Sequence, residues 1–239
     1  MNTTAYEQRR SQIEHYFDRT AADAWARLTS NEPVGRIRAT VRAGRDTMRE
    51  TLLSWLPQDL RGLRVLDAGC GTGALALQAA LRGADVVAID LSPTLVKLAA
   101  ERMADEHPAL RGSVQFMSGD MLSPELGHFD HVVCMDSLIH YDSDQISHAL
   151  AGLAQRTRGS MVFTFAPRTP LLALMHSAGR LFPRSDRSPS LSPVLAWDSG
   201  SSHDVPRRKP PSPSSTPTTT VLPSQSPRCS KTRQTPTPR

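Results

Sequence analysis

Three glycines at alternate positions, Gly69, Gly71 and Gly73, are the residues of this sequence whose spacing points most directly to chemistry. They follow the apolar run 63–66 and an acid, Asp67, so the chain turns tightly where a buried strand is predicted to end. Glycine allows that turn and lets a ligand approach the backbone closely. A carboxylate at the end of the strand can face a cationic group such as the ammonium of an amino acid. The pattern therefore predicts a site for a small ligand that carries such a cation.

Three further acids stand at or just after the ends of the next three predicted strands. Asp90 could accept hydrogen bonds from ribose hydroxyls, and Asp120 could accept one from an adenine amino group. Asp136 follows the fourth strand. A single aspartate at a strand end is often only a helix cap, but four in series favour a nucleoside ligand. The predicted cofactor-binding residues are Asp67, Gly69, Cys70, Gly71, Gly73, Asp90, Leu91, Asp120, Met121 and Asp136.

The glycine pattern alone leaves two cofactors open. The glycines together with Ala74 also satisfy the fingerprint of an NAD-dependent dehydrogenase, and Asp90 stands about where its ribose-binding acid falls. Against that alternative, Asp67 is an acid where the fingerprint normally has an apolar residue, and Asp120 has no role in it. Two predicted helices also precede the glycine loop. We therefore predict S-adenosylmethionine as the cofactor.

The elements that must position these residues are short apolar runs alternating with amphipathic segments. The predicted strands are 63–66, 85–89, 114–117, 131–135 and 160–165, and the predicted helices are 74–81, 92–103, 143–153 and 170–181. Such alternation is typical of an α/β fold with a parallel sheet and helices on both faces. In that fold the ligand lies beyond the carboxyl ends of the strands, where the acids and glycines fall.

Two helices are predicted before this sheet, and residues 1–57 are expected to form a lid over the active site. Packing of residues 7–30 on the sheet as core is the alternative. The second helix has an apolar face of Val34, Ile37, Val41, Met48, Leu52 and Trp55. Its other face carries Arg36, Arg38, Arg42, Arg45 and Arg49, and we expect that face to be solvated.

Segments 65–73, 87–90, 117–121 and 129–138 resemble the successive cofactor motifs of class I S-adenosylmethionine-dependent methyltransferases, whose sheet is Rossmann-like. Segments 14–20, 25–28, 41–49, 166–169 and 181–189 resemble the magnesium-protoporphyrin IX O-methyltransferase family. This second resemblance covers about residues 7–189. It implies methyl transfer to one propionate of magnesium protoporphyrin in bacteriochlorophyll or chlorophyll synthesis. It also implies contact with magnesium chelatase.

Under this resemblance, His140 and Tyr141 are expected beside the transferring methyl group. Either could hydrogen-bond the propionate, and His140 could instead be an axial ligand of the substrate's magnesium. The alternative is that His140 is a loop residue bonded to backbone. The expected porphyrin-contacting residues are Tyr16, Phe17, Trp25 and Arg168. Another small acid or a quinone as acceptor, and a non-catalytic relic that only binds the cofactor, remain open.

Charge and cysteine content exclude several other classes. The net charge of +5 belongs to residues 190–239, which hold seven basic and two acidic residues, so the rest of the chain is neutral and no nucleic acid is expected as a partner. Three scattered cysteines predict neither a disulfide framework nor a zinc site, and we expect no protein-bound metal. The absence of a signal core or a membrane-spanning run predicts a cytoplasmic protein, with a peripheral place at the photosynthetic membrane as a further expectation.

Residues 190–239 differ in composition from the rest, because 28 of these 50 residues are Pro, Ser or Thr. We expect a disordered tail here, in place of the last two strands of the methyltransferase sheet. Such a composition is typical of GC-rich DNA read out of frame, so a frameshift is one hypothesis and a genuine extension the other. The predicted organisation is a lid at 1–57, a cofactor-binding core at 58–189 and this tail.

Overall fold

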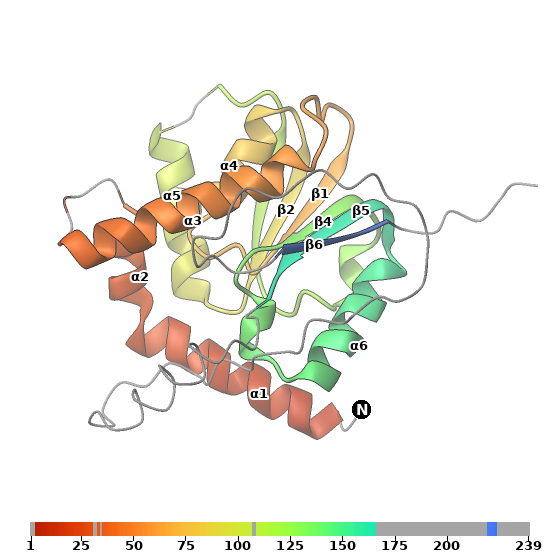
Figure 1. The fold of residues 1–239 in the computed structure, drawn as a ribbon, viewed down its shortest axis with the longest axis horizontal. Helices are drawn as coiled ribbons and strands as arrows, with labels where there is room; N and C mark the ends of the chain where they lie inside the picture. The colour runs from red at the N-terminus through yellow and green to blue at the C-terminus, as the bar shows by residue number, and fades with distance from the viewer. Residues whose placement is uncertain (1–2, 31–32, 34, 107–108, 166–218, 224–239) are drawn as a thin grey trace, which may run out of the picture.

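The computed structural model describes residues 3–30, 33, 35–106, 109–165 and 219–223, and it confirms the α/β class (Figure 1). The strands are β1 (Arg64–Ala68), β2 (Asp85–Asp90), β3 (Ser113–Ser118), β4 (Phe129–Cys134), β5 (Thr157–Thr164) and β6 (Thr219–Pro223). They form one sheet in the order β3-β2-β1-β4-β5-β6, in which β1 to β5 are parallel to one another. Strand order reverses between β1 and β4, which is where open sheets of this kind bind ligands.

Helices cover both faces of the sheet. Those of the N-terminal part are α1 (Thr3–His15), a five-residue π-helix (Tyr16–Thr20), α2 (Ala22–Leu28) and α3 (Arg36–Ser54). The others are α4 (Ala74–Leu81), α5 (Pro93–Glu106), α6 (Ser143–Ala154) and two short 3-10 helices, Pro124–Leu126 and Leu138–His140. Asp142 is the N-cap of α6. Its side chain accepts the backbone N–H of Gln145, and the Gln145 side chain accepts the backbone N–H of Asp142, which together form a capping box.

The core has two halves because side chains alternate along each strand. Leu66 and Val132 pack on one side of the sheet with α1 and α6, to which Tyr6 and Ile13 of α1 contribute. Val65 and the residues of other strands that share its face of the sheet point to the other side, where α3 and α4 cover them. Strands buried on both faces read as continuous apolar runs, which is why they were recognisable in the sequence.

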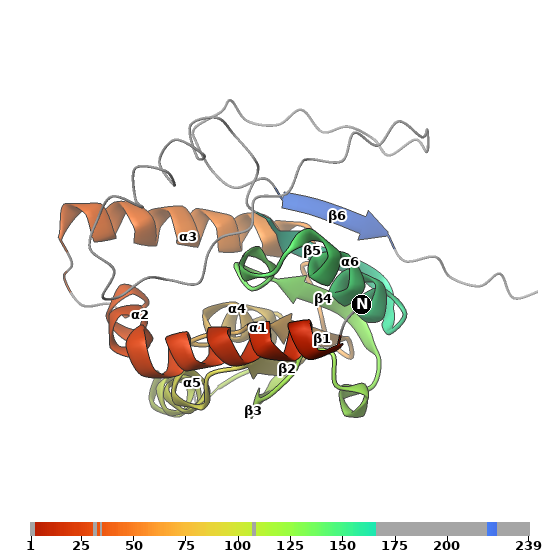
Figure 2. The ribbon, with the colours of Figure 1, turned by 90° about the horizontal axis from the view of Figure 1, so that it is seen from below.

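Helix α3 is oriented differently from the sequence-based expectation. Ile37 is 83% exposed and Val41 46% exposed, although both belong to the predicted apolar face. The reason is that α3 packs on the sheet side through its last turns, at Leu52 and Leu53, whereas its first half extends past the sheet toward α2 (Figure 2). Arg36 and Arg38 are exposed, but Arg42, Arg45 and Arg49 are partly buried, so the expectation of a fully solvated arginine face is wrong for these three.

Strand β6 pairs antiparallel with β5, with Val221 opposite Val162. Residues 219–223 thus form a strand where the sequence analysis expected none, and the replacement of the last two methyltransferase strands by a tail stays a prediction. Threonine and valine at 219–221 favour extended backbone, and Pro223 is tolerated because it ends an edge strand. The rest of the predicted tail and the predicted helix at 170–181 lie outside the described residues, and the frameshift hypothesis stays a prediction.

Candidate active site

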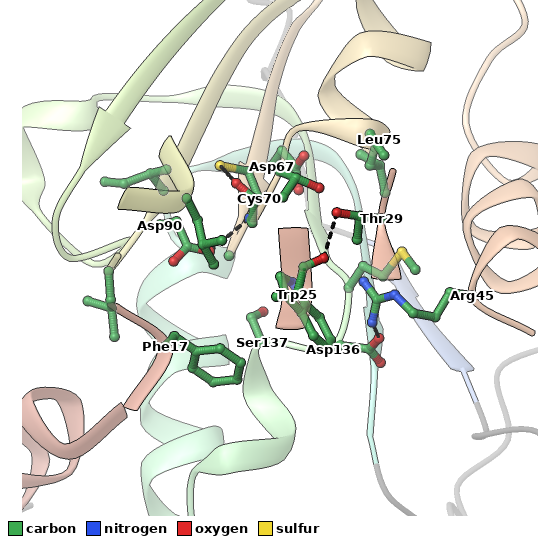
Figure 3. A pocket seen from close by; sticks show the side chains of 18 of the residues that line it. Phe17, Trp25, Thr29, Arg45, Asp67, Cys70, Leu75, Asp90, Asp136 and Ser137 are labelled. Carbon is green, nitrogen blue, oxygen red and sulfur yellow. Dashed lines mark hydrogen bonds and ion pairs between the residues drawn. The ribbon is translucent and has the colours of Figure 1, made fainter. Parts of the chain in front are cut away.

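A cavity of about 340 Å³ lies at the carboxyl ends of the strands (Figure 3). The loops after β1, β2, β3 and β4 form one wall, and residues of α1, α2, α3 and the π-helix form the other. The predicted site residues that line it are Phe17, Trp25, Asp67, Gly69, Cys70, Gly71, Asp90, Leu91, Asp120, Met121, Asp136, His140 and Tyr141. Most of the residues predicted for the site therefore line one cavity, and their roles stay predictions.

Three predicted residues are not among those that line the cavity. Gly73 begins α4 with φ +79°, and a Cβ there would lie 2.9 Å from the Phe116 ring, so this glycine is required by helix–sheet packing. Tyr16 lies against Phe17, with its ring centroid 5.1 Å from that of its neighbour. Arg168 lies outside the described residues. In the N-terminal helices, Phe17 and Trp25 line the cavity while Tyr6 and Ile13 belong to the core, and the lid role stays a prediction.

The glycine loop and the loop after β4 touch at Gly69. Its φ is +85°, and a Cβ built on it would lie only 2.3 Å from the Cβ of Ser137. The backbone N–H groups of Gly69 and Cys70 both donate to the carbonyl of Ile89, at 2.8 and 3.0 Å. The Cys70 thiol is buried, which raises its pKa, so it is a small loop residue and not a nucleophile.

Asp90 holds two loops in place. Its carboxylate accepts the backbone N–H of Gly71 at 2.8 Å and that of Ser92 at 2.9 Å. Burial raises the pKa of Asp90, and these backbone hydrogen bonds oppose the rise. A carboxylate has about four acceptor positions, so Asp90 can still accept hydrogen bonds from ribose hydroxyls.

Asp67 is the group whose environment most clearly calls for a ligand. Its side chain is 1% exposed, and among the described residues its Oδ2 has no hydrogen-bond partner. Burial raises the pKa of Asp67 to about 7, against a hydrogen bond from the Ala76 backbone that lowers it. A buried unpaired oxygen is costly, and a cationic ammonium beside it would remove that cost. The residues present therefore fit the amino-acid end of S-adenosylmethionine.

We expect the affinity for this ligand to depend on the protonation of Asp67. Because its pKa is raised to about 7, the free protein binds a proton there below that pH, and the ammonium must displace it. The affinity for S-adenosylhomocysteine should then fall by up to about tenfold per pH unit below 7. Calorimetry at pH 5.5 to 7.5 in buffers of different ionisation enthalpy measures both effects. Asp67→Asn should bind weakly and without proton release, and an affinity independent of pH in the original chain would contradict this.

Asp120 is joined to α1. Its carboxylate accepts the Tyr6 hydroxyl at 3.0 Å, Arg10 Nη1 at 2.9 Å and the backbone N–H of Leu122 at 2.9 Å. The contact with adenine expected of Asp120 remains a prediction. The sequence analysis did not identify Tyr6 and Arg10. Their spacing of four residues within the predicted lid, which places a tyrosine and a cation on one helix face, was the one feature that could have indicated them.

Asp136 adopts φ +57°, a left-handed conformation that non-glycine residues seldom take outside turns and functional sites. Its backbone N–H donates to Thr164 Oγ1 at 2.7 Å, and its carboxylate forms an ion pair with Arg45 of α3. The Arg45 guanidinium also lies 4.5 Å from the centroid of the Trp25 ring. The sequence analysis placed Arg45 on the arginine face of the second predicted helix, but nothing in that pattern indicated that Arg45 lines a cavity.

His140 ends the short helix after β4 and is buried in the cavity wall. Its ring is edge-on to Phe17, with centroids 5.1 Å apart, and among the described residues its Nδ1 has no hydrogen-bond partner. Burial, with a smaller effect of Arg9, lowers the pKa of His140 to about 4, so the imidazole is neutral near pH 7. A neutral imidazole can donate or accept a hydrogen bond, or bind a metal.

Tyr141 stacks on Tyr6, with ring centroids 5.7 Å apart and an angle of 20° between the rings. Burial raises its pKa, so the phenol stays protonated. Through Tyr6 this residue is coupled to Asp120. Among the residues that the structure describes, no three His, Cys, Asp or Glu side chains form a metal-binding group.

The chain is similar to known methyltransferases. Residues 134–198 match the family model of the magnesium-protoporphyrin IX methyltransferase C-terminus, and residues 65–159 match that of a methyltransferase domain. A magnesium-protoporphyrin O-methyltransferase of Rhodobacter capsulatus is 54% identical over 189 residues, which are 79% of this chain and 83% of the relative. A ubiquinone biosynthesis O-methyltransferase of Xanthomonas oryzae pv. oryzae is 38% identical over 132 residues, 53% of this chain and 54% of the relative.

A solved structure has a similar fold. The crystal structure of the magnesium protoporphyrin IX methyltransferase from Synechocystis PCC 6803 with bound SAH matches with a TM-score of 0.66 and 31% identity. The match covers 76% of this chain and 83% of that one. The glycine pattern alone left NAD and S-adenosylmethionine open as cofactors. The match to a methyltransferase domain, which includes the glycine loop and Asp67, decides for S-adenosylmethionine.

Proposed function

The chain belongs to the magnesium-protoporphyrin O-methyltransferase family, and on that premise we propose that it methylates a propionate carboxylate of magnesium protoporphyrin IX with S-adenosylmethionine as donor. One observation carries the proposal. A single cavity is lined by Asp67 at the glycine loop and by His140 beside Phe17, and within the described part of the chain Asp67 Oδ2 and His140 Nδ1 have no hydrogen-bond partner. The first suits the ammonium of the donor, and the second suits a polar group of the acceptor.

The reaction needs orientation more than proton transfer. A propionate has a pKa near about 4.3, so it is already an anion at neutral pH. A bond forms between its oxygen and the methyl carbon, the carbon–sulfur bond breaks, and that electron pair stays on sulfur as a neutral thioether. No proton moves, so a neutral His140 is suitable. Correct alignment can supply about 7–11 kcal/mol of the barrier reduction, and a dry site favours a step that neutralises charge.

The roles of individual side chains follow from their positions. Asp67 and Asp90 orient the donor, and Phe17 and Trp25 offer flat apolar contact to the macrocycle. His140 either hydrogen-bonds the reacting propionate or binds the magnesium of the substrate, and Tyr141, which stacks on Tyr6, is the other candidate to hydrogen-bond the propionate. The magnesium belongs to the substrate in either case.

Incubation with labelled S-adenosylmethionine and magnesium protoporphyrin IX is expected to give the labelled monomethyl ester, separable by chromatography. The 38% identity to a ubiquinone biosynthesis O-methyltransferase makes a quinone the matched competing acceptor, and a small carboxylic acid is another. Turnover of either without turnover of the porphyrin would contradict the proposed substrate. Tight cofactor binding without any turnover would indicate a non-catalytic relic.

Two features of cellular context are also proposed, and both are supported by the family relationship alone. One is contact with magnesium chelatase, which would supply the magnesium porphyrin. The other is a cytoplasmic location peripheral to the photosynthetic membrane. None of the helices in the described part of the chain has the length and apolar character that crossing a bilayer requires. Co-sedimentation with membranes and with the chelatase, before and after a salt wash, would test both.

A further inference from the structure

Helix α3 contributes cationic side chains to the cavity that the proposed reaction does not use. Arg42, Arg45 and Arg49 all line it, on the side opposite the glycine loop. Arg42 donates to the backbone carbonyls of Arg27 and Leu28, both at 2.9 Å, and so joins α3 to α2. Arg49 pairs with a neighbour on its own helix. Arg45 differs from both because it reaches across the cavity to the loop after β4.

Arg45 is held in an orientation that suits anion binding. Its side chain is 21% exposed, and its guanidinium lies over the Trp25 ring (Figure 3). Within the described residues, Nη1 is its only nitrogen that donates a hydrogen bond, and the acceptor is Asp136. A guanidinium has five donors in a planar fork, so Arg45 can bind a carboxylate while keeping its contact with Asp136.

Aromatic rings set the spacing between Arg45 and His140. The Phe17 ring contacts the His140 ring at 5.1 Å between centroids and the Trp25 ring at 5.9 Å. Trp25 in turn lies beneath Arg45 at 4.5 Å. The two polar groups therefore stand at opposite ends of a row of two aromatic side chains that faces the cavity.

The proposed substrate has matching chemistry. Protoporphyrin carries two propionates on one edge of a flat apolar ring, and only one of them is esterified. The other enters the cavity as an anion and leaves it as an anion. Burying that carboxylate without a cationic partner would be costly, and a partner fixed at one place would also orient the ring.

Resting on the proposed function, we propose that Arg45 binds the propionate that is not methylated and so determines which propionate reaches the methyl group. Asp136 keeps the guanidinium turned toward the cavity, and Trp25 supports it from below. His140 then receives the reacting propionate or the magnesium at the other end of the row. The residue acts on substrate specificity, and the donor does not depend on it.

Equilibrium binding to two porphyrins tests this without any turnover. Arg45→Gln should weaken the binding of magnesium protoporphyrin IX about ten- to a hundredfold, the effect of losing a hydrogen bond to a charged group, and leave its dimethyl ester unchanged. Porphyrin fluorescence anisotropy measures both. Arg45→Lys, which keeps the charge but not the fork, should be intermediate. Arg38→Gln is the matched control, because Arg38 is exposed on the same helix, and it should bind both porphyrins normally.

The alternative is that Arg45 only holds the loop after β4 through Asp136. In that case Arg45→Gln would weaken S-adenosylhomocysteine binding and both porphyrins alike, and Asp136→Asn would do the same. Our proposal expects unchanged S-adenosylhomocysteine affinity in Arg45→Gln and two isomeric monomethyl esters among its products. Porphyrin binding unchanged in Arg45→Gln would overturn the inference alone. An original chain that binds neither porphyrin would instead overturn the proposed function.

Discussion

Replacing Gly69 with valine is expected to abolish the binding of S-adenosylmethionine. A Cβ at this position would lie 2.3 Å from the Cβ and 3.4 Å from the Cα of Ser137, and φ is +85°. The clash is with atoms at or next to the backbone, so the loops after β1 and β4 would have to separate, and both line the cavity. We expect a loss of affinity for S-adenosylhomocysteine of at least about a hundredfold by calorimetry, which corresponds to about 2.7 kcal/mol.

Two other glycines provide the comparison. At Gly71 a Cβ would lie 3.3 Å from Nε1 of Trp25, which is a side chain that can move, so Gly71→Ala should weaken binding less than any change at Gly69. At Gly44 within α3, a Cβ would meet no atom within 4 Å apart from the adjacent residues and the nearby backbone of the helix itself. Gly44→Ala should bind normally and gain about 1 kcal/mol of stability from its higher helix propensity. Equal affinities at all three sites would contradict the assignment of the glycine loop.

Removing the imidazole of His140 is expected to reduce kcat for methyl transfer about a hundredfold while leaving S-adenosylhomocysteine affinity within about twofold. The reason is that without His140 the acceptor is less well aligned with the methyl group, which lowers the rate of transfer, whereas the residues that contact the donor lie elsewhere in the cavity. His148→Ala is the matched control because that histidine is exposed on α6. His140→Gln should recover activity if the role is a hydrogen bond to the propionate, and should not if the role is magnesium binding. Unchanged kcat in His140→Ala would contradict both.

The pH dependence of activity provides a second measurement on the same residue. Burial lowers the pKa of His140 to about 4, so kcat should show no titration near 6.5. The unfolded chain binds a proton at about 6.5 and the folded chain only near 4, so the contribution of His140 to stability is complete above 6.5 and decreases as the pH falls toward 4. His140→Ala should lose this part of the acid sensitivity in denaturant titrations at pH 4.5 and 7.

The central part of the fold and the donor side of the cavity could be predicted because their signals are local. Val65 and Leu66 alternate between two buried faces, and such a run can be recognised without knowing its partners. Gly69 needs a positive φ, and Asp67 is the second-last residue of a strand, so both properties depend on a few neighbouring residues. Strand β6 was missed because five residues among prolines become a strand only when the edge of β5 is there to pair with them.

The amino-acid sequence alone therefore determined the parallel sheet, the glycine loop and the row of acids at the strand ends. Only the tertiary structure decided which side of α3 faces the cavity, and that Arg45 meets Asp136 91 residues later and Tyr6 meets Asp120 114 residues later. The physical reason is that helical periodicity shows that a helix has two different faces but not what each face packs against. A row of arginines has the same sequence pattern whether it faces solvent or lines a binding site. The way α3 packs past the sheet is what places some of these arginines at the cavity.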